Sequence, residues 1–213
     1  MQLFSNFIID RIVYAAEPKK KHQKRIDAPE EYDFLSCTSM DAPVMLPPAN
    51  SSAQTKHEMQ EIAMAQTSHK NPGKLEQKYD DMFLDDFGRV IKKAGHEFDI
   101  EKCKRLVKEA ASITIRLKYK YNRPRPFQLE SFLGIDVTKY SSSTAKTPAF
   151  PSGHSAQSML VALYLGDKHP DLKDKLIEVA KDISLSRLVG GHHFSSDIKY
   201  GEVLGKWMHS NLK

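Results

Sequence analysis

The sequence of 213 residues predicts an all-α fold, a single-domain helical bundle. Beyond residue 50, apolar side chains recur at the i, i+3 and i+4 spacing of one buried helical face. No segment shows the strict apolar–polar alternation of a half-buried strand. Glycine, proline and cap residues separate the apolar stripes. We therefore expect an N-terminal arm over residues 1–50, extended or partly helical, and a helical domain over residues 51–213.

Cap and break residues delimit the first helices of this domain. Ser51 or Ser52 can cap a helix that runs to about Thr67, and Asn71–Gly73 then breaks the chain. Two further apolar stripes predict two amphipathic helices, the second of which must end before the prolines of the "NRPRP" segment. The first stripe comprises Leu75, Tyr79, Met82, Phe83, Phe87, Val90, Ile91 and Ala94, and the second comprises Cys103, Leu106, Val107, Ala110, Ala111, Thr114 and Leu117.

Three more helices are expected after a loop over residues 127–150. The segment "PSGHSAQSMLVALYLG" begins with residues that suit a cap and a first turn, and its apolar positions then follow one face. A helix follows that ends at Gly190 and Gly191, since paired glycines commonly terminate helices. The last helix is predicted from about Ser196 to His209.

Composition narrows the classes of partner. The 32 Lys and Arg residues exceed the 27 Asp and Glu residues by five, which is a mild preference for anionic partners. The basic cluster Lys19–Arg25 has no interleaved aromatic residues, so a hydrated linker is favoured over a nucleic-acid contact. The longest apolar run, Met159–Leu165, is far shorter than the roughly 20 residues of a membrane helix, so no membrane span and a soluble protein are expected.

The cysteines and the first residues bear on the compartment. Cys37 and Cys103 match no metal-binding or redox spacing, which favours free thiols in a reducing compartment. The first 18 residues lack a basic leader, and charged residues interrupt their apolar stretch, so we expect no signal peptide. The prediction is a cytoplasmic protein, with export as the alternative.

Three polar clusters fall at the predicted helix ends: Lys118–Pro126, Pro151–His154 and Ser186–Asp197. They supply three cations, two histidines and one carboxylate: Lys118, Arg125, Arg187, His154, His193 and Asp197. A phosphoryl group in transfer spreads negative charge over its equatorial oxygens, so fixed cations and N–H donors stabilise it. Ser152 and Gly153 at a helix start add backbone N–H groups that suit an anion. If His193 and Asp197 share a helical turn, their spacing of four lets the carboxylate orient the ring.

The motifs K-x6-R-P, P-S-G-H and S-R-x5-H-x3-D, at Lys118 to Pro126, Pro151 to His154 and Ser186 to Asp197, carry a resemblance. In order and spacing they resemble the tripartite signature of the type 2 phosphatidic-acid phosphatase superfamily. The segments "RPRPF" and "GGHHFSSD" are similar to its soluble branch, the bacterial class A nonspecific acid phosphatases, which are related to vanadium haloperoxidases. The resemblance implies the helical fold of that group.

The resemblance also implies roles for individual residues. His193 would be the nucleophile that forms a phosphohistidine, Asp197 would orient it, and His154 would protonate the leaving group. Lys118, Arg125, Ser152, Gly153 and Arg187 would bind the phosphate. In the chain's own register, Arg125 fits the motif better than Arg123, because Arg116 rather than a lysine stands at the required distance before Arg123.

The expected function is therefore a metal-independent acid phosphatase that acts on small-molecule phosphomonoesters, nucleotides among them, and uses no cofactor. A vanadate-dependent haloperoxidase is one alternative, because the same residues can hold vanadate. The other alternative is a nucleic-acid-binding protein that uses the basic arm. For the expected phosphatase, no nucleic-acid partner is predicted. The sequence is compatible with a homo-oligomer. His192 is interpreted as a cavity-wall or surface residue, and the histidines outside the motifs, His22 among them, as exposed or structural.

Overall fold

The computed structural model describes residues 2–80 and 83–213, and their regular structure is helical. The helices are α1 (Gln2–Asp10), α2 (Lys20–Asp27), α3 (Ala53–Ser68), α4 (Pro72–Asp80), α5 (Leu84–Lys93), α6 (Ile100–Tyr121), α7 (Pro126–Leu133), α8 (Gly153–Lys168), α9 (Lys173–Val189) and α10 (Ser195–Ser210), with a 3-10 turn, η1 (Pro170–Leu172), before α9. Across this described part of the chain there is no strand, only an isolated bridge between Leu35 and Leu212. The predicted all-α fold is confirmed.

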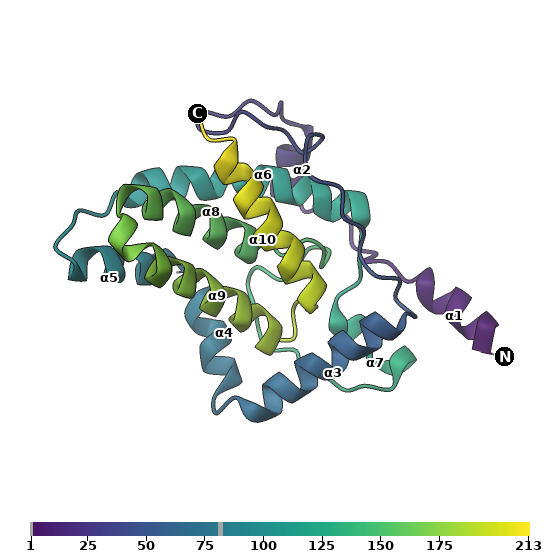
Figure 1. Ribbon diagram of the computed structural model, residues 1–213. Coiled ribbons are helices and arrows are strands. Elements are labelled where there is room, and N and C mark those ends of the chain that lie inside the picture. The colour runs from purple at the N-terminus through teal and green to yellow at the C-terminus, as the bar shows by residue number, and fades with distance from the viewer. Residues whose placement is uncertain (1, 81–82) are drawn as a thin grey trace.

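Helix α8 is the central element of the bundle, with α6, α9 and α10 packed around it (Figure 1). Its sequence explains this place, because its apolar and small residues cover most of the helix surface instead of one narrow stripe. The buried residues of α8 are Ser155, Ala156, Ser158, Met159, Leu160, Val161, Ala162, Leu165 and Gly166. A helix buried on most sides can be contacted by several neighbours at once.

Two glycines of α10 allow this helix to cross α8 at close range. A Cβ atom at Gly201 would lie 2.5 Å from the carbonyl oxygen of Ser152, and one at Gly205 would lie 2.6 Å from that of Ala156. Any larger residue would therefore push the two helices apart. The close approach brings the start of α10 against the start of α8, where the Ser152 amide donates a hydrogen bond of 2.9 Å to the Asp197 carbonyl.

Local signals place the ends of the predicted helices. Ser52 caps α3 by accepting from the Thr55 amide, and Ser152 caps α8 by accepting from the Ser155 amide. Helix α6 ends at Asn122, whose φ of 49° is left-handed, immediately before the Arg-Pro pairs. Helix α9 ends at Gly190, as expected.

Two expectations about elements were wrong. The expected loop over residues 127–150 contains helix α7 at its start, where Pro126 occupies the first helical position and Gly134, with a φ of 66°, ends the helix. The stripe from Leu75 to Ala94 is divided between α4 and α5. Met82, which belongs to that stripe, lies outside the described residues.

The N-terminal residues contact the helical domain at several points. Leu35 and Cys37 are buried in a cluster with residues of α6, α8 and α10. Helix α1 projects at the edge of the molecule, whereas α2 lies along α6 (Figure 1). The basic cluster Lys19–Arg25, which was expected to be a hydrated linker, is thus largely helical. Both cysteines are buried free thiols.

The helices differ in length, and the longest, α6, has 22 residues. None of those in the described ranges combines the length and the apolar character that a membrane crossing requires.

Candidate active site

The three predicted polar clusters meet where α6 and α9 end and where α8 and α10 begin. Lys118 lies in the last turn of α6, and Arg125 directly precedes α7. Ser152 caps α8, and Gly153 and His154 begin it. Arg187 lies in the last turn of α9, His193 precedes α10, and Asp197 lies in the first turn of α10. Helix starts present free N–H groups, so two of these four ends favour a bound anion.

A cavity of about 290 Å³ lies at this junction. Six of the eight predicted site residues line it: Lys118, Arg125, Gly153, His154, Arg187 and His193. Ser152 and Asp197 do not line it, since both are fully buried behind its wall. The Ser152 hydroxyl oxygen accepts hydrogen bonds from the Ser155 amide and hydroxyl. This side chain therefore caps α8 and does not reach the cavity. Ser152 thereby fixes the position of Gly153.

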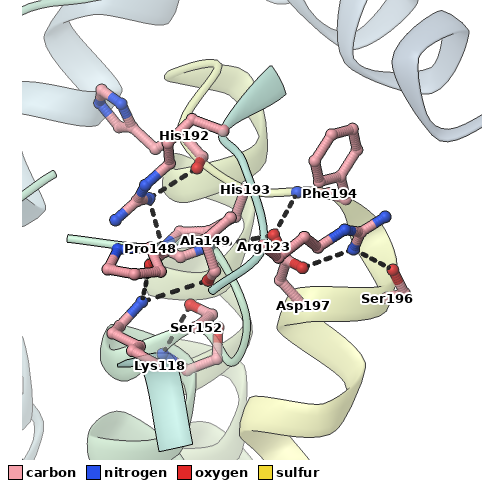
Figure 2. Close-up of polar contacts among 12 residues, drawn as sticks. Lys118, Arg123, Pro148, Ala149, Ser152, His192, His193, Phe194, Ser196 and Asp197 are labelled. Carbon is pink, nitrogen blue, oxygen red and sulfur yellow. Dashed lines mark hydrogen bonds and ion pairs between the residues drawn. The ribbon is translucent and has the colours of Figure 1, made fainter. Parts of the chain in front are cut away.

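Lys118 and Arg125 form one side of the cavity, and both are buried. The Lys118 ammonium donates to the carbonyl oxygens of Pro148 at 2.7 Å and Ala149 at 3.1 Å (Figure 2). These bonds use two of its three N–H donors, so one remains for a ligand. Arg125 donates from Nε to the Thr147 carbonyl at 2.8 Å. Backbone carbonyls thus hold both cations in place without cancelling their charge.

Arg187 forms another side and is held by carboxylates. Its Nη1 lies 3.2 Å from Glu76 Oε1 and 3.2 Å from Asp80 Oδ1. Its Nε is buried and has no hydrogen-bond partner within residues 2–80 and 83–213. A buried donor without a partner is costly, so this N–H group favours an acceptor such as a phosphate oxygen.

The electrostatics of the cavity favour an anion. Burial lowers the pKa of Arg125 to about 10, and burial together with Arg125 lowers the pKa of Lys118 well below its usual value. Asp80 is the one carboxylate among the described lining residues, and hydrogen bonds from Ser142 and Thr144 outweigh its burial and lower its pKa. An anion in the cavity would relieve the repulsion among the cations.

His193 has the hydrogen bonds of a neutral ring whose Nε2 lone pair accepts from an arginine. Its Nδ1 lies 3.3 Å from the Asp197 carboxylate, which can only accept, so Nδ1 carries the proton. Its Nε2 lies 3.0 Å from Arg125 Nη1, which can only donate, so Nε2 presents its lone pair. Burial, Arg125 and Lys118 lower the pKa of His193 well below its usual value. The ring is therefore poised as a nucleophile or base at Nε2.

His193 lies before α10 and not on a helical turn with Asp197, contrary to the assumption made from their spacing. Asp197 reaches back from the first turn, where its Oδ2 also accepts from the Phe194 amide at 2.9 Å (Figure 2). This is the arrangement of a capping residue, which explains why the contact survives without a shared helical face.

His154 occupies the first turn of α8. Its Nε2 lies 3.0 Å from the backbone carbonyl of Asp80, an obligate acceptor, so Nε2 carries a proton and Nδ1 is the nitrogen that can gain or lose one. Burial and the nearby Arg187 lower the pKa of His154 to about 3. His154 is therefore neutral until an anion offsets the surrounding positive charge.

Arg123, which fits the motif spacing less well than Arg125, lies behind His193. It is buried, and its Nη1 donates to Asp197 Oδ1 at 2.6 Å and to Ser196 Oγ at 2.7 Å (Figure 2). Its Nη2 donates to Glu58 Oε2 at 3.2 Å. Asp197 thus receives three donors, which fix its carboxylate against the His193 ring. The sequence signal was the first Arg-Pro pair of "NRPRP", which motif spacing alone could not assign.

Two other histidines differ from expectation. His192 is buried, and its Nε2 lies 3.0 Å from Glu76 Oε1, so it belongs to the carboxylate support of Arg187 instead of the cavity wall or the surface. His22 of α2 lines the cavity, although it was expected to be exposed or structural. With it, Lys19, Lys21 and Arg25 also line the cavity. No pattern in the sequence predicted that α2 would lie there.

The described residues contain no cluster of three or more His, Cys, Asp or Glu side chains suited to a metal ion. The positive charge of the cavity comes from its own side chains. Lys118, Arg125 and Arg187 line the same cavity as His154 and His193. This arrangement can bind a tetrahedral oxyanion and present a nitrogen nucleophile to it.

The similarity to known proteins lies in the part of the chain that contains the site. Residues 107–209 match the family model of the PAP2 superfamily. A non-specific acid phosphatase from Providencia stuartii is 30% identical over 113 residues, covering 50% of this chain and 44% of that protein. A non-specific acid phosphatase from Salmonella typhi is 32% identical over 92 residues, covering 43% of this chain and 36% of that protein. The matched part of the chain thus spans less than half the length of these relatives.

A solved structure is similar in fold. The crystal structure described as the first bacterial vanadium-dependent iodoperoxidase superposes with a TM-score of 0.55 over 81% of this chain and 52% of that one. The two sequences are 15% identical, so this likeness concerns the arrangement of the helices.

Proposed function

We propose that this chain, whose residues 107–209 match the family model of the PAP2 superfamily, is a metal-independent acid phosphatase that hydrolyses small phosphomonoesters through a phosphohistidine at His193. The observation that carries the proposal is the environment of His193 Nε2. This atom is unprotonated and accepts from Arg125, at a cavity that three buried cations line. Curated relatives named acid phosphatases support the same reaction class.

In the first step, the phosphoryl group is bound by Lys118, Arg125 and Arg187, with the Gly153 amide at the start of α8. His193 Nε2 attacks phosphorus, and the bond from phosphorus to the ester oxygen breaks. Asp197 accepts the Nδ1 proton in a hydrogen bond and stabilises the positive charge that the ring acquires. The bound ester monoanion gives its proton to His154, and the departing oxygen takes this proton and leaves as an alcohol.

In the second step, water replaces the alcohol beside His154. The neutral His154 removes a proton from the water as its oxygen attacks phosphorus, and the bond from phosphorus to Nε2 breaks. Inorganic phosphate leaves with the proton that His154 took from the water, so His193 regains its lone pair and His154 returns to its neutral state. Fixed cations supply the charge stabilisation that a metal supplies in other phosphatases, so the scheme requires none.

Trapping the phosphorylated enzyme tests the proposal directly. We expect ³²P-labelled substrate, followed by an alkaline quench, to leave an acid-labile label on the native protein and none on His193→Ala. His57→Ala removes an exposed histidine of α3 and serves as the matched control, since it should be labelled like the native protein. Turnover of p-nitrophenyl phosphate by His193→Ala at the native rate would refute the proposal.

A second measurement tests the role of His154. The variant His154→Ala should lose far more activity on an alkyl phosphate than on p-nitrophenyl phosphate, because p-nitrophenolate leaves without a proton. An equal loss on both esters would contradict proton donation by His154. Activity that persists in EDTA is expected, and halide oxidation with vanadate and peroxide in place of ester hydrolysis would assign the cavity to peroxidase chemistry instead.

A further inference from the structure

Helix α2 places a second group of cations at the cavity. Lys21 and Arg25 of α2, with Lys19 directly before it and Lys146 of the loop before α8, line the same cavity as His154 and His193. We call these four residues the outer cations. They are distinct from the inner cations Lys118, Arg125 and Arg187, which are buried, because Lys19, Lys21 and Lys146 are exposed and Arg25 is half-buried.

Among the residues that the structure describes, the outer cations have no anionic partner. None of the four forms an ion pair or a side-chain hydrogen bond with another described residue. Arg187, by contrast, is paired with Glu76 and Asp80, and Asp80 also accepts from hydroxyl groups. His22 lies among the outer cations, and its Nδ1 is buried without a partner in the described chain. Burial and Lys21 lower the pKa of His22, so the field there is positive.

The segments on both sides of α2 are hydrogen-bonded to residues in or next to α6. After its C-terminal end, the Ala28 carbonyl accepts a hydrogen bond of 2.5 Å from Arg116 of α6. Before its N-terminal end, the Tyr14 amide donates to the Asn122 carbonyl at 3.1 Å. Lys21 and Arg25 are thus carried by a helix that packs against α6.

We propose that Lys21 and Arg25, with Lys19 and Lys146, form a second phosphate subsite, so that the preferred substrates carry another phosphate group on the part that leaves. This inference rests on the proposed phosphatase function. The inner cations match the one phosphoryl group that is transferred, and the outer cations then remain for an additional anion. Arginine and lysine are the side chains that bind phosphate most readily.

The size of the cavity limits the substrate to a small molecule. A volume of about 290 Å³ is close to the lower end of the roughly 300–1,000 Å³ of small-molecule sites. A sugar bisphosphate fits this description, because its two phosphates are separated by a short polar body. The subsite would select it over the corresponding monophosphate.

Helix α2 itself provides a matched control. Lys21 and Arg25 are four residues apart and line the cavity, whereas Lys20 and Lys24 are also four apart on the same helix and do not. The variants Lys21→Met/Arg25→Met and Lys20→Met/Lys24→Met therefore remove equal charge from one helix. Only the first removes it from the cavity.

The experiment compares kcat/KM for glucose 1,6-bisphosphate and glucose 6-phosphate. We expect the native protein to prefer the bisphosphate, and the preference to fall about tenfold in Lys21→Met/Arg25→Met, as for the loss of one charge-assisted hydrogen bond. It should stay within about twofold of native in Lys20→Met/Lys24→Met, because screened surface charges contribute little. An equal fall in both variants, or no fall in the first, would overturn the proposal.

Calorimetry separates failure of the subsite from failure of the proposed function. If the native protein hydrolyses neither sugar phosphate nor p-nitrophenyl phosphate, the phosphatase proposal fails. Tighter binding of glucose 1,6-bisphosphate than of glucose 6-phosphate, lost in Lys21→Met/Arg25→Met alone, would still establish the subsite. Equal affinity of the native protein for the two sugars would refute it, whatever the activity.

Discussion

Binding of a dianion at this site should take up a proton, and the amount follows from the state of His154. Its pKa is lowered to about 3 by burial and Arg187, so at pH 5 only about 1% of the free protein carries this proton. Sulfate is a suitable probe because it stays a dianion throughout this range and cannot be hydrolysed. Its two charges would offset the cations and raise the pKa of His154 toward the reference value of about 6.5. Nearly one proton per sulfate should then be taken up at pH 5.

Linkage sets the sign of the accompanying change in affinity. Between the pKa of the free state and that of the complex, only the complex holds the proton, so affinity rises as pH falls, by about tenfold per pH unit at most. Isothermal titration in buffers of different ionisation enthalpy measures the number of protons. His154→Gln should bind sulfate without the uptake, and His22→Gln, which alters the other histidine of the cavity wall, should retain it. Uptake that persists in His154→Gln would refute this assignment.

Three further predictions concern positioning, packing and pH. Replacing Arg123 by Met leaves the buried Asp197 and Glu58 carboxylates without their cation, so unfolding free energy should fall by about 3–5 kcal/mol in chemical denaturation. The exposed Arg89→Met should cost no more than about 1 kcal/mol, and a similar small loss for Arg123→Met would contradict the argument. Gly201→Ala should destabilise by about 1–3 kcal/mol, because its Cβ would lie 2.5 Å from a backbone oxygen, whereas Lys206→Ala on the exposed face should not. If the proposed function is correct, kcat/KM should fall above about pH 6, where phosphate monoesters lose their second proton. The neutral His154 then receives no proton from the substrate. A value of kcat/KM that still rises at pH 9 would contradict this prediction.

The elements that could be predicted are those whose signals are local. Caps at Ser52 and Ser152, the glycines after α9 and the prolines after α6 depend on neighbours within a few residues, and the structure agrees with each. Helix α7 was missed because its eight residues are too few for an apolar period to emerge. The stripe that spans α4 and α5 continues from one helix to the other, so periodicity alone does not separate them.

The site could be predicted to the extent that its residues belong to motifs with fixed spacing. The motifs identified six of the residues that line the cavity but not the residues that hold them in place. Glu76 and Asp80 of α4 contact Arg187 more than 100 residues later in the chain, and Glu58 of α3 reaches Arg123. Such contacts depend on how helices pack, which a single sequence does not encode in any short pattern. The same holds for α2, whose cations approach the cavity only because α2 packs on α6.

The buried cations of the site have two kinds of support, and the difference affects how strongly the site binds an anion. Carboxylates support Arg187 and Arg123 from behind, whereas Lys118 and Arg125 are held by carbonyl groups and keep their charge. Neutralising the latter pair with carboxylates would have made the empty site more stable, and it would also have weakened anion binding and raised the pKa of both histidines. A cavity that is repulsive when empty gains most from a ligand that brings negative charge and a proton together. A phosphate monoester below its second pKa brings both, and a second phosphate on its leaving part would extend the same compensation to the cations of α2.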